Sequence, residues 1–230
     1  MKTILISGTS SVGKTSLIKH LVPYLKHFSL SPFLCKIDCL ESDDDIVYKK
    51  LNVPYMLGLS KDICPDHFLV SNLNNLISHS TKKSCDILLI ETAGLCNRCS
   101  PATNKTFHIC VCDCTSSFKT PAKLGPMLTH ADIVVLSKID MVSQAEREII
   151  SYNIKKINPT CDIFYLDGLV GYGSELIANH ILSYDADNIS EHLLRHTMPS
   201  GICSYCIGEC RIADEFELGV VDKMDFKGEY

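Results

Sequence analysis

The chain has 230 residues, of which 46% are hydrophobic, and its formal net charge is −5. This length and composition suit one folded domain with a sizeable core and exclude an intrinsically disordered chain. No apolar stretch approaches the roughly 18 residues that a membrane span needs, and no basic stripe favours nucleic acid as a partner. We therefore expect a cytoplasmic protein that binds neither membranes nor nucleic acids.

Short apolar strands alternate with amphipathic helices along most of the chain. Strands are predicted at 3–7, 33–37, 86–90, 107–112, 132–136 and 162–166. Helices are predicted at 15–25, 67–80, 143–157 and 174–182. This alternation predicts an α/β fold with a doubly wound, mostly parallel sheet.

The composition changes near Tyr184. We expect residues 1–185 to form the main domain and residues 186–230 to form a Cys-rich C-terminal extension. The extension is too short for a large core of its own. Within it, residues 189–196 are predicted as a short helix.

A complete phosphate-binding loop follows the first predicted strand. Residues 8–15, Gly-Thr-Ser-Ser-Val-Gly-Lys-Thr, match the pattern G-x-x-x-x-G-K-[ST] between a strand and a helix. Glycines let the backbone wrap a phosphate, and amide groups at the helix start face the anion. We expect Lys14 to reach the outer phosphates and Thr15 to bind Mg²⁺. The predicted nucleotide contacts in this region are Gly8, Ser10, Ser11, Val12, Gly13, Lys14, Thr15 and Ser16.

Two acidic residues occur at the carboxyl ends of predicted strands. Asp38 and Glu91 occupy the edge where doubly wound sheets place their ligands. We predict that Mg²⁺ is held by Thr15, Asp38 and Glu91, although strand-end acids can also be solvated or capping residues. Lys14, Asp38 and Glu91 are the candidate catalytic residues, since Lys14 and Mg²⁺ would stabilise charge on a transferred phosphoryl group. The backbone of residues 92–94 would sense a γ-phosphate.

The segment Ser137-Lys138-Ile139-Asp140 follows another apolar strand. It resembles the Asn/Thr/Ser-Lys-x-Asp motif of GTPases, in which the carboxylate accepts from guanine and the Lys stem stacks on the base. Adenine would leave the Asp140 carboxylate without matching donors, at a cost of about 1–3 kcal/mol. Ser137, Lys138 and Asp140 are therefore predicted base-binding residues, and GTP is expected rather than ATP.

Taken in chain order, these segments resemble one branch of the P-loop GTPases over residues 1–183. This branch contains the hydrogenase nickel-incorporation and urease-accessory proteins, with cobalamin-associated relatives. The resemblance implies weak intrinsic turnover, a homodimer that closes on GTP, and transfer of a transition metal to a client metalloenzyme. It also implies that Asp38 helps to position the attacking water. The segments that carry it are residues 8–15, 36–39, 90–94, 118–121, 131–141, 158–159 and 171–176.

Thirteen cysteines are present. Because the count is odd and the chain carries a nucleotide site, a secreted disulfide scaffold is excluded and metal binding is favoured. Cys64-Pro65-Asp66-His67 lies where the urease-accessory proteins have Cys-Pro-His, a nickel-binding point between protomers, with Asp66 inserted. Cys64 and His67 are therefore candidate ligands for Ni²⁺ or Zn²⁺. The alternative is an ordinary helix start, with Pro65 in the first turn.

Two further cysteine motifs lie in loop-like segments. Cys96-Asn97-Arg98-Cys99 follows the γ-phosphate-sensing segment, where iron–sulfur ATPases of the superfamily place a cluster cysteine; redox or packing roles are the alternatives. Cys203, Cys206 and Cys210 offer three thiolates for zinc or a cluster, or for a structural zinc knuckle. Cys110 and Cys112 instead alternate along a predicted strand and are expected to fill the core.

The sequence thus predicts a GTP hydrolase that couples nucleotide-dependent dimerisation to delivery of nickel or a metal cluster to a client metalloenzyme. One alternative is an iron–sulfur-carrying, nucleotide-gated redox ATPase or cluster carrier. Another is a metal-storage or sensor module in which the nucleotide is structural.

Overall fold

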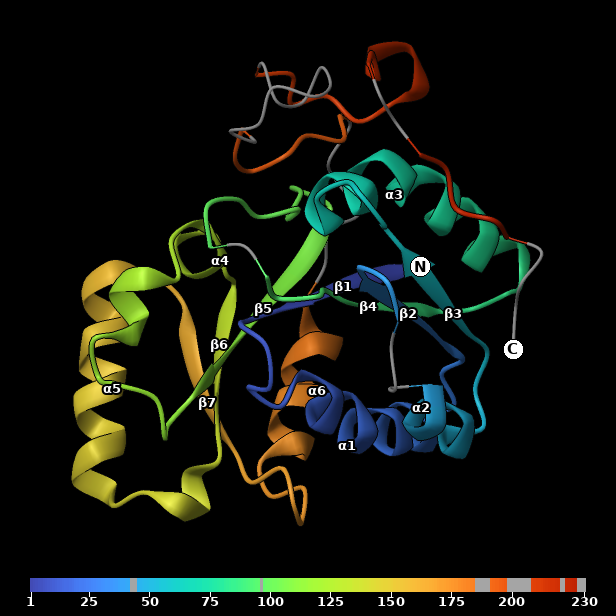
Figure 1. Cartoon of the computed structure of the whole chain (residues 1–230). Helices are drawn as coiled ribbons and strands as arrows, with labels where there is room; N and C mark the ends of the chain where they lie inside the picture. The colour runs from blue at the N-terminus through green and yellow to red at the C-terminus, as the bar shows by residue number, and fades with distance from the viewer. Residues whose placement is uncertain (42–44, 96, 185–190, 198–207, 220–221, 227–230) are drawn as a thin grey trace.

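The computed structural model describes residues 1–41, 45–95, 97–184, 191–197, 208–219 and 222–226. Its centre is a seven-stranded sheet in the order β3-β2-β4-β1-β5-β6-β7, and every neighbouring pair is parallel (Figure 1). This confirms the predicted fold class. The strands are β1 (Lys2–Ser7), β2 (Pro32–Asp38), β3 (Tyr55–Leu59), β4 (Ile87–Glu91), β5 (Thr106–Asp113), β6 (Ile133–Ser137) and β7 (Asp162–Leu166).

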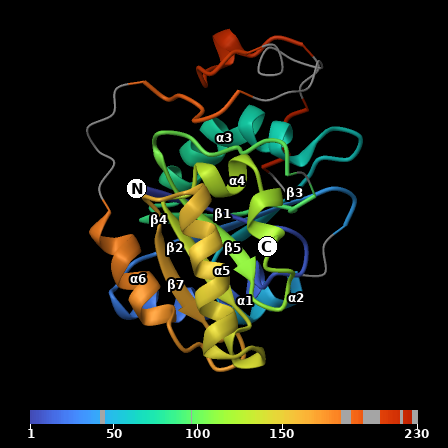
Figure 2. The same cartoon turned by 90° about the vertical axis from the view of Figure 1, so that its left-hand side faces the viewer.

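Helices cover both faces of the sheet, as Figures 1 and 2 show. Ile4 and Ile6 of β1 pack toward one group of helices, whereas Leu5 between them packs toward α3. Because successive strand side chains point to opposite faces, apolar residues in unbroken runs bury both sides of each central strand. Among the described helices, none combines the length and the apolar character that crossing a membrane requires. The α-helices are α1 (Lys14–His27), α2 (Asp45–Leu51), α3 (Pro65–Lys82), α4 (Pro126–Thr129), α5 (Gln144–Ile157) and α6 (Ser174–Ser183).

Local signals set several helix starts. The Ser143 hydroxyl accepts from the Glu146 N–H while the Glu146 carboxylate accepts from the Ser143 N–H, a complete capping box at the start of α5. Cys64 is the N-cap residue of α3, and Pro65 occupies the first helical position, where its missing N–H costs nothing. These starts lie close to where the sequence predicts them.

The edge strand β3 and the short helices α2 and α4 were not predicted from the sequence. β3 is formed by pairing with β2, in a register that places Gly58 beside Ile37. A Cβ atom on Gly58 would lie 2.8 Å from the Ile37 side chain and 2.9 Å from that of Met224. The strand therefore depends on close tertiary packing rather than on a strong local pattern.

The predicted helix at 189–196 is wrong for its described part. Leu194 forms an antiparallel bridge with Thr103, and Leu193 forms one with Arg211. The Leu194 N–H donates to the Cys210 carbonyl at 2.8 Å, so these backbone groups are used by neighbouring segments instead of a helix. Since much of residues 186–230 lies outside the described residues, the division into a domain and an extension stays a prediction.

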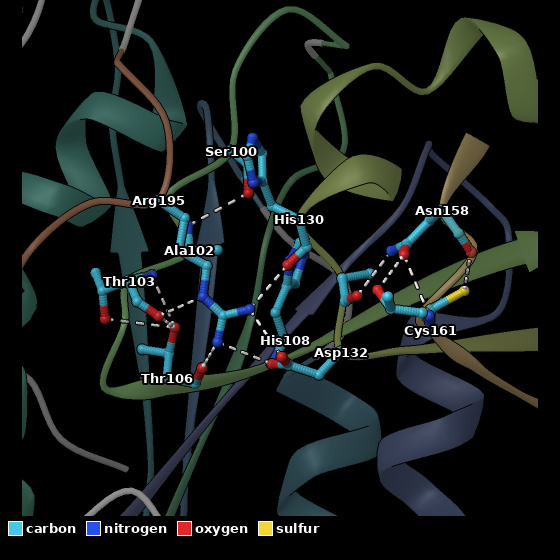
Figure 3. Close-up of polar contacts among 12 residues, drawn as sticks. Ser100, Ala102, Thr103, Thr106, His108, His130, Asp132, Asn158, Cys161 and Arg195 are labelled. Atoms are coloured by element: carbon cyan, nitrogen blue, oxygen red, sulfur yellow. Dashed lines mark hydrogen bonds and ion pairs between the residues drawn. The ribbon is translucent and has the colours of Figure 1, made fainter. Parts of the chain in front are cut away.

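Arg195 anchors this segment to the amino ends of β5 and β6 (Figure 3). Its Nε donates to the Thr103 carbonyl at 2.8 Å, and one terminal nitrogen donates to the His130 carbonyl at 2.9 Å. The other donates to the Thr106 carbonyl at 2.7 Å, and both bind the Asp132 carboxylate at 2.9 Å. All five guanidinium donors can thus be satisfied by this site.

We expect Arg195→Met to release the segment and to lower the free energy of unfolding by about 2–3 kcal/mol, because carbonyls and a half-buried carboxylate lose their donor. Urea unfolding and limited proteolysis after residue 190 measure the two effects. Arg211→Ala is the matched control, since Arg211 pairs with Glu209 at the surface, and it should change stability by less than about 0.5 kcal/mol. Equal protease resistance of both variants would refute the anchoring role.

Candidate nucleotide and metal site

The loop of residues 8–15 lies at the carboxyl end of β1 and leads into α1. Gly8 has φ +143, and a Cβ atom there would lie 2.4 Å from the Val111 carbonyl oxygen. Gly94 has φ +78, and its Cβ would lie 2.2 Å from the Gly8 carbonyl oxygen. Only glycine fits both positions, so the loop after β4 can approach the phosphate-binding loop closely.

The predicted nucleotide residues gather around two cavities that share Gly13 and Ser16. One has a volume of about 390 Å³ and is lined by Ser10, Ser11, Gly13, Lys14, Thr15, Ser16, Lys36, Asp38, Glu91, Ala93 and Leu95. The other, of about 230 Å³, is lined by Gly13, Ser16, Ser137, Lys138, Asp140, Met141, Leu166, Gly168 and Leu169. The predicted phosphate and base residues thus lie in adjoining spaces. We call the larger one, which contains Lys14 and Thr15, the phosphate cavity, and the smaller one, which contains Ser137 and Asp140, the base cavity. Gly8 and Val12 are predicted nucleotide contacts that line neither cavity, and the Val12 side chain packs in the core.

The Lys14 side chain is buried within the loop that carries it. Its Nζ donates to the Gly8 carbonyl at 3.0 Å and to the Thr9 carbonyl at 2.9 Å. The ammonium group is therefore held at the phosphate cavity by the loop's own backbone.

Glu91, the last residue of β4, is only 1% exposed and accepts several hydrogen bonds. The Thr15 hydroxyl donates to its two oxygens at 2.9 and 3.1 Å. Lys36 Nζ lies 2.5 Å from Oε1, and the Tyr48 hydroxyl lies 2.6 Å from Oε2. Lys36 and Tyr48 were not predicted as site residues, because only the pairing of β2 with β4 and the packing of α2 bring them to Glu91.

The oxygen donors in this cavity fit Mg²⁺. Asp38, the last residue of β2, lines the cavity, and its Oδ1 accepts from the Cys39 N–H at 2.9 Å. The Thr15 hydroxyl donates a hydrogen bond to Glu91, so the lone pairs of the Thr15 oxygen stay available to a cation. A hydroxyl and two carboxylates form the kind of hard oxygen set that Mg²⁺ prefers.

Ser137 and Lys138 connect the base cavity to neighbouring loops. The Ser137 hydroxyl donates to the Val12 carbonyl at 2.6 Å, so it ties this motif to the phosphate-binding loop. Lys138 has φ 55, and its Nζ lies 2.5 Å from Asp113 Oδ2. Burial raises the pKa of Asp113, but hydrogen bonds from Lys138 and Thr115 outweigh it and leave the pKa lowered. Asp140 is exposed at the cavity rim.

A second group of side chains joins the start of α3 to the loop after β4. The ligand atoms of Cys64, Asp66 and Cys99 all lie within 4.8 Å of one another. The Cys99 Sγ donates to Asp66 Oδ2 at 3.2 Å. Hydrogen bonds from Cys99, from His67 and from two backbone amides outweigh the opposing effect of burial and lower the pKa of Cys64 below its usual value. Burial raises the pKa of Asp66 to about 7.

The structure therefore rearranges the predicted metal ligands. It brings Cys64 to Cys99, although the sequence places them in separate motifs, and it adds Asp66, which was predicted only as an insertion at a helix start. His67 hydrogen-bonds Cys64 but does not belong to the group of three. Cys96, Cys203 and Cys206 lie outside the described residues. Cys210 is partly buried elsewhere, near Gly208, and Cys110 and Cys112 fill the core as predicted.

The two thiols are each connected through the backbone to the end of a strand that carries one of the acids. Cys99 follows Glu91 in the loop after β4. The segment before Cys64 is bonded to the end of β2, because the Ser60 N–H donates to the Asp38 carbonyl at 2.9 Å and the Lys61 N–H donates to the Cys39 carbonyl at 2.8 Å. A movement of the backbone at either acid can therefore be transmitted along these segments to a thiol.

Residues 2–165 match the model of the CobW/HypB/UreG nucleotide-binding domain family. The protein MJ0120 of Methanocaldococcus jannaschii is 45% identical over 231 residues, covering 100% of this chain and 99% of its own. The urease accessory protein UreG of Yersinia pestis is 26% identical over 211 residues, covering 85% and 92%.

Solved structures share the fold. The hydrogenase maturation factor HypB of Archaeoglobus fulgidus superposes with a TM-score of 0.64 at 20% identity, covering 79% of this chain and 89% of its own. HypB of Helicobacter pylori, solved in complex with nickel, gives a TM-score of 0.64 at 17% identity, covering 79% and 86%. The chain therefore belongs to the CobW/HypB/UreG family of nucleotide-binding domains.

Proposed function

We propose that this protein is a cytoplasmic GTP hydrolase that couples its nucleotide state to the binding and delivery of a transition metal, held by Cys64, Asp66 and Cys99, to a client metalloenzyme. The observation that carries the proposal is the backbone connection of the two thiols to the strand ends that carry Asp38 and Glu91: residues 60 and 61, before Cys64, bond to the end of β2, and Cys99 follows β4. A reducing compartment would keep both thiols available as ligands.

Hydrolysis would rest on charge stabilisation and positioning. Lys14 would contact the outer phosphates, while Thr15, Asp38 and Glu91 would hold Mg²⁺, which supplies positive charge to the phosphate oxygens. Asp38 would orient the attacking water. The resulting chemistry needs no covalent intermediate on the protein.

The proposed cargo site, formed by Cys64, Asp66 and Cys99, has a ligand set suited to binding a metal ion and passing it on. Two sulfurs and one carboxylate suit a thiophilic ion such as Ni²⁺ or Zn²⁺. Three ligands leave a fourth position for a second copy of the chain or for the client. The nickel complex of HypB and the urease-accessory role named for UreG support nickel as the cargo.

Coupling would follow from loop movement and nucleotide-dependent dimerisation. A γ-phosphate that repositions the Asp38 and Glu91 loops would change the separation of Cys64 and Cys99. By linkage, metal binding must then alter the affinity for GTP by the same factor by which GTP alters the affinity for metal.

Anaerobic metal titration in the two nucleotide states tests the proposal. We expect Ni²⁺ affinity, measured by chelator competition, to differ by about 10-fold or more between the GTP-analogue and GDP complexes, and size-exclusion chromatography to show a dimer with the analogue. Identical affinities, or no metal bound after Ni²⁺, Zn²⁺ and iron–sulfur reconstitution, would refute it. A brown protein with a reducible cluster and a preference for ATP would instead support the redox alternative.

Asp140→Asn is expected to weaken GTP binding by about 10–100-fold and to favour xanthosine triphosphate, because an amide donor would face the xanthine C2 carbonyl. Displacement of a fluorescent nucleotide measures both affinities. Asp162→Asn, at an exposed position at the start of β7, is the control and should leave GTP binding unchanged. Unaltered base selectivity in Asp140→Asn would exclude this residue from guanine recognition.

A further inference from the structure

Lys36 is a buried lysine in the wall of the phosphate cavity. It lies on β2, directly opposite Glu91 of β4, and is 5% exposed. Its Nζ lies 2.5 Å from Glu91 Oε1. The cavity that it lines also contains Lys14 and Thr15, so two ammonium groups from different elements face the same space.

A purely structural role accounts poorly for this placement. Glu91 already accepts hydrogen bonds from Thr15 and Tyr48. Burying an ammonium group is costly, and replacing a buried ion pair by apolar residues is often neutral for stability. A triphosphate entering the cavity would attract the ammonium of Lys36 and repel the carboxylate of Glu91. These opposite forces favour separation of the two side chains.

We propose that Lys36 is a second phosphate-binding lysine, which holds Glu91 in the nucleotide-free protein and turns its ammonium group to the terminal phosphate of bound GTP. The flexible four-carbon stem of lysine permits this short movement within one cavity. Thr15 and Tyr48 continue to hold Glu91 after Lys36 leaves it. The proposal rests on the proposed GTP-binding function and adds a residue that distinguishes GTP from GDP.

The test compares the affinities of a non-hydrolysable GTP analogue and of GDP in three variants. Lys36→Met is expected to weaken analogue binding by about 10–100-fold, the effect of one charged hydrogen bond, and to change GDP binding by less than about threefold. Lys36→Arg, which keeps the charge, should restore most of the analogue affinity. Tyr48→Phe removes another donor to Glu91 without a charge, and should alter both affinities alike so that their ratio is kept.

Equal weakening of both nucleotides in Lys36→Met would overturn the proposal, because it would assign Lys36 a structural role only. If Lys36→Met does not fold, the crystal structure of the wild-type protein with Mg²⁺ and the analogue decides. Lys36 within hydrogen-bond distance of the terminal phosphate supports the proposal, and Lys36 still on Glu91 overturns it. Wild-type protein that binds neither nucleotide would overturn both this proposal and the proposed function, whereas binding with an unchanged ratio in Lys36→Met would overturn this one alone.

Discussion

Lys14→Ala is expected to lower the rate of the proposed GTP hydrolysis by about 10³-fold, which amounts to its loss if intrinsic turnover is as weak as the family resemblance implies. The substitution removes a buried ammonium group placed at the phosphate cavity by two loop carbonyls. Lys36 also lines the cavity, but it lies on β2 and pairs with Glu91, so it does not occupy the position of Lys14. Single-turnover phosphate release measures the effect.

Lys19→Ala is the matched control for this experiment, because Lys19 lies on the exposed side of the same helix α1. Its hydrolysis rate should stay within about twofold of the wild type, as expected of a surface substitution far from the cavity. Thermal unfolding of both variants checks that the fold is kept. Turnover that persists in pure, folded Lys14→Ala would exclude the loop of residues 8–15 as the site of hydrolysis.

Cys64→Ser and Cys99→Ser are each expected to lower Ni²⁺ affinity by about 100-fold or more, since loss of an outer hydrogen-bond partner of a metal site alone typically costs 10–100-fold. A serine oxygen is a poor substitute for a thiolate toward a thiophilic ion. Asp66→Asn should weaken binding less, because the amide oxygen can still approach the metal. Competition with a coloured chelator under anaerobic conditions measures all three variants.

Cys85→Ser provides the control for the cysteine series. Cys85 is also buried, but it lies before the amino end of β4, whereas the loop of Cys99 follows the carboxyl end of that strand. Its replacement should leave Ni²⁺ affinity unchanged. If Cys64→Ser and Cys99→Ser bind the metal as tightly as this control does, the cargo must be held elsewhere.

Structural features that depend on short, contiguous stretches of residues could be predicted from the sequence. The phosphate-binding loop, the capping box of α5 and the apolar runs of the central strands each depend on neighbours within a few residues. The positions of Asp38 and Glu91 at strand ends beside the cavity could also be predicted, because ligands of a doubly wound sheet bind at the carboxyl ends of its strands. Predicting these positions needs only the order of strands and helices. The role of the two acids in holding Mg²⁺ stays a prediction.

Features that depend on distant segments could not be predicted. The segment 191–197 is not helical because residues 102–104 and 210–212 supply its backbone partners, which local helix propensity cannot anticipate. The pairing of Lys36 with Glu91 depends on strand register, since a shift of one residue would turn the lysine to the other face.

The cysteines show the same division. The sequence by itself determined that this chain carries a phosphate-binding-loop pattern, a segment that resembles a GTPase base motif, and several thiols in segments predicted as loops. Only the tertiary structure decided that Cys64 meets Cys99, and that Asp66 joins them while His67 stays beside Cys64. A metal site is defined by distances between atoms of separate loops, and those distances follow from the packing of α3 against the sheet rather than from spacing along the chain.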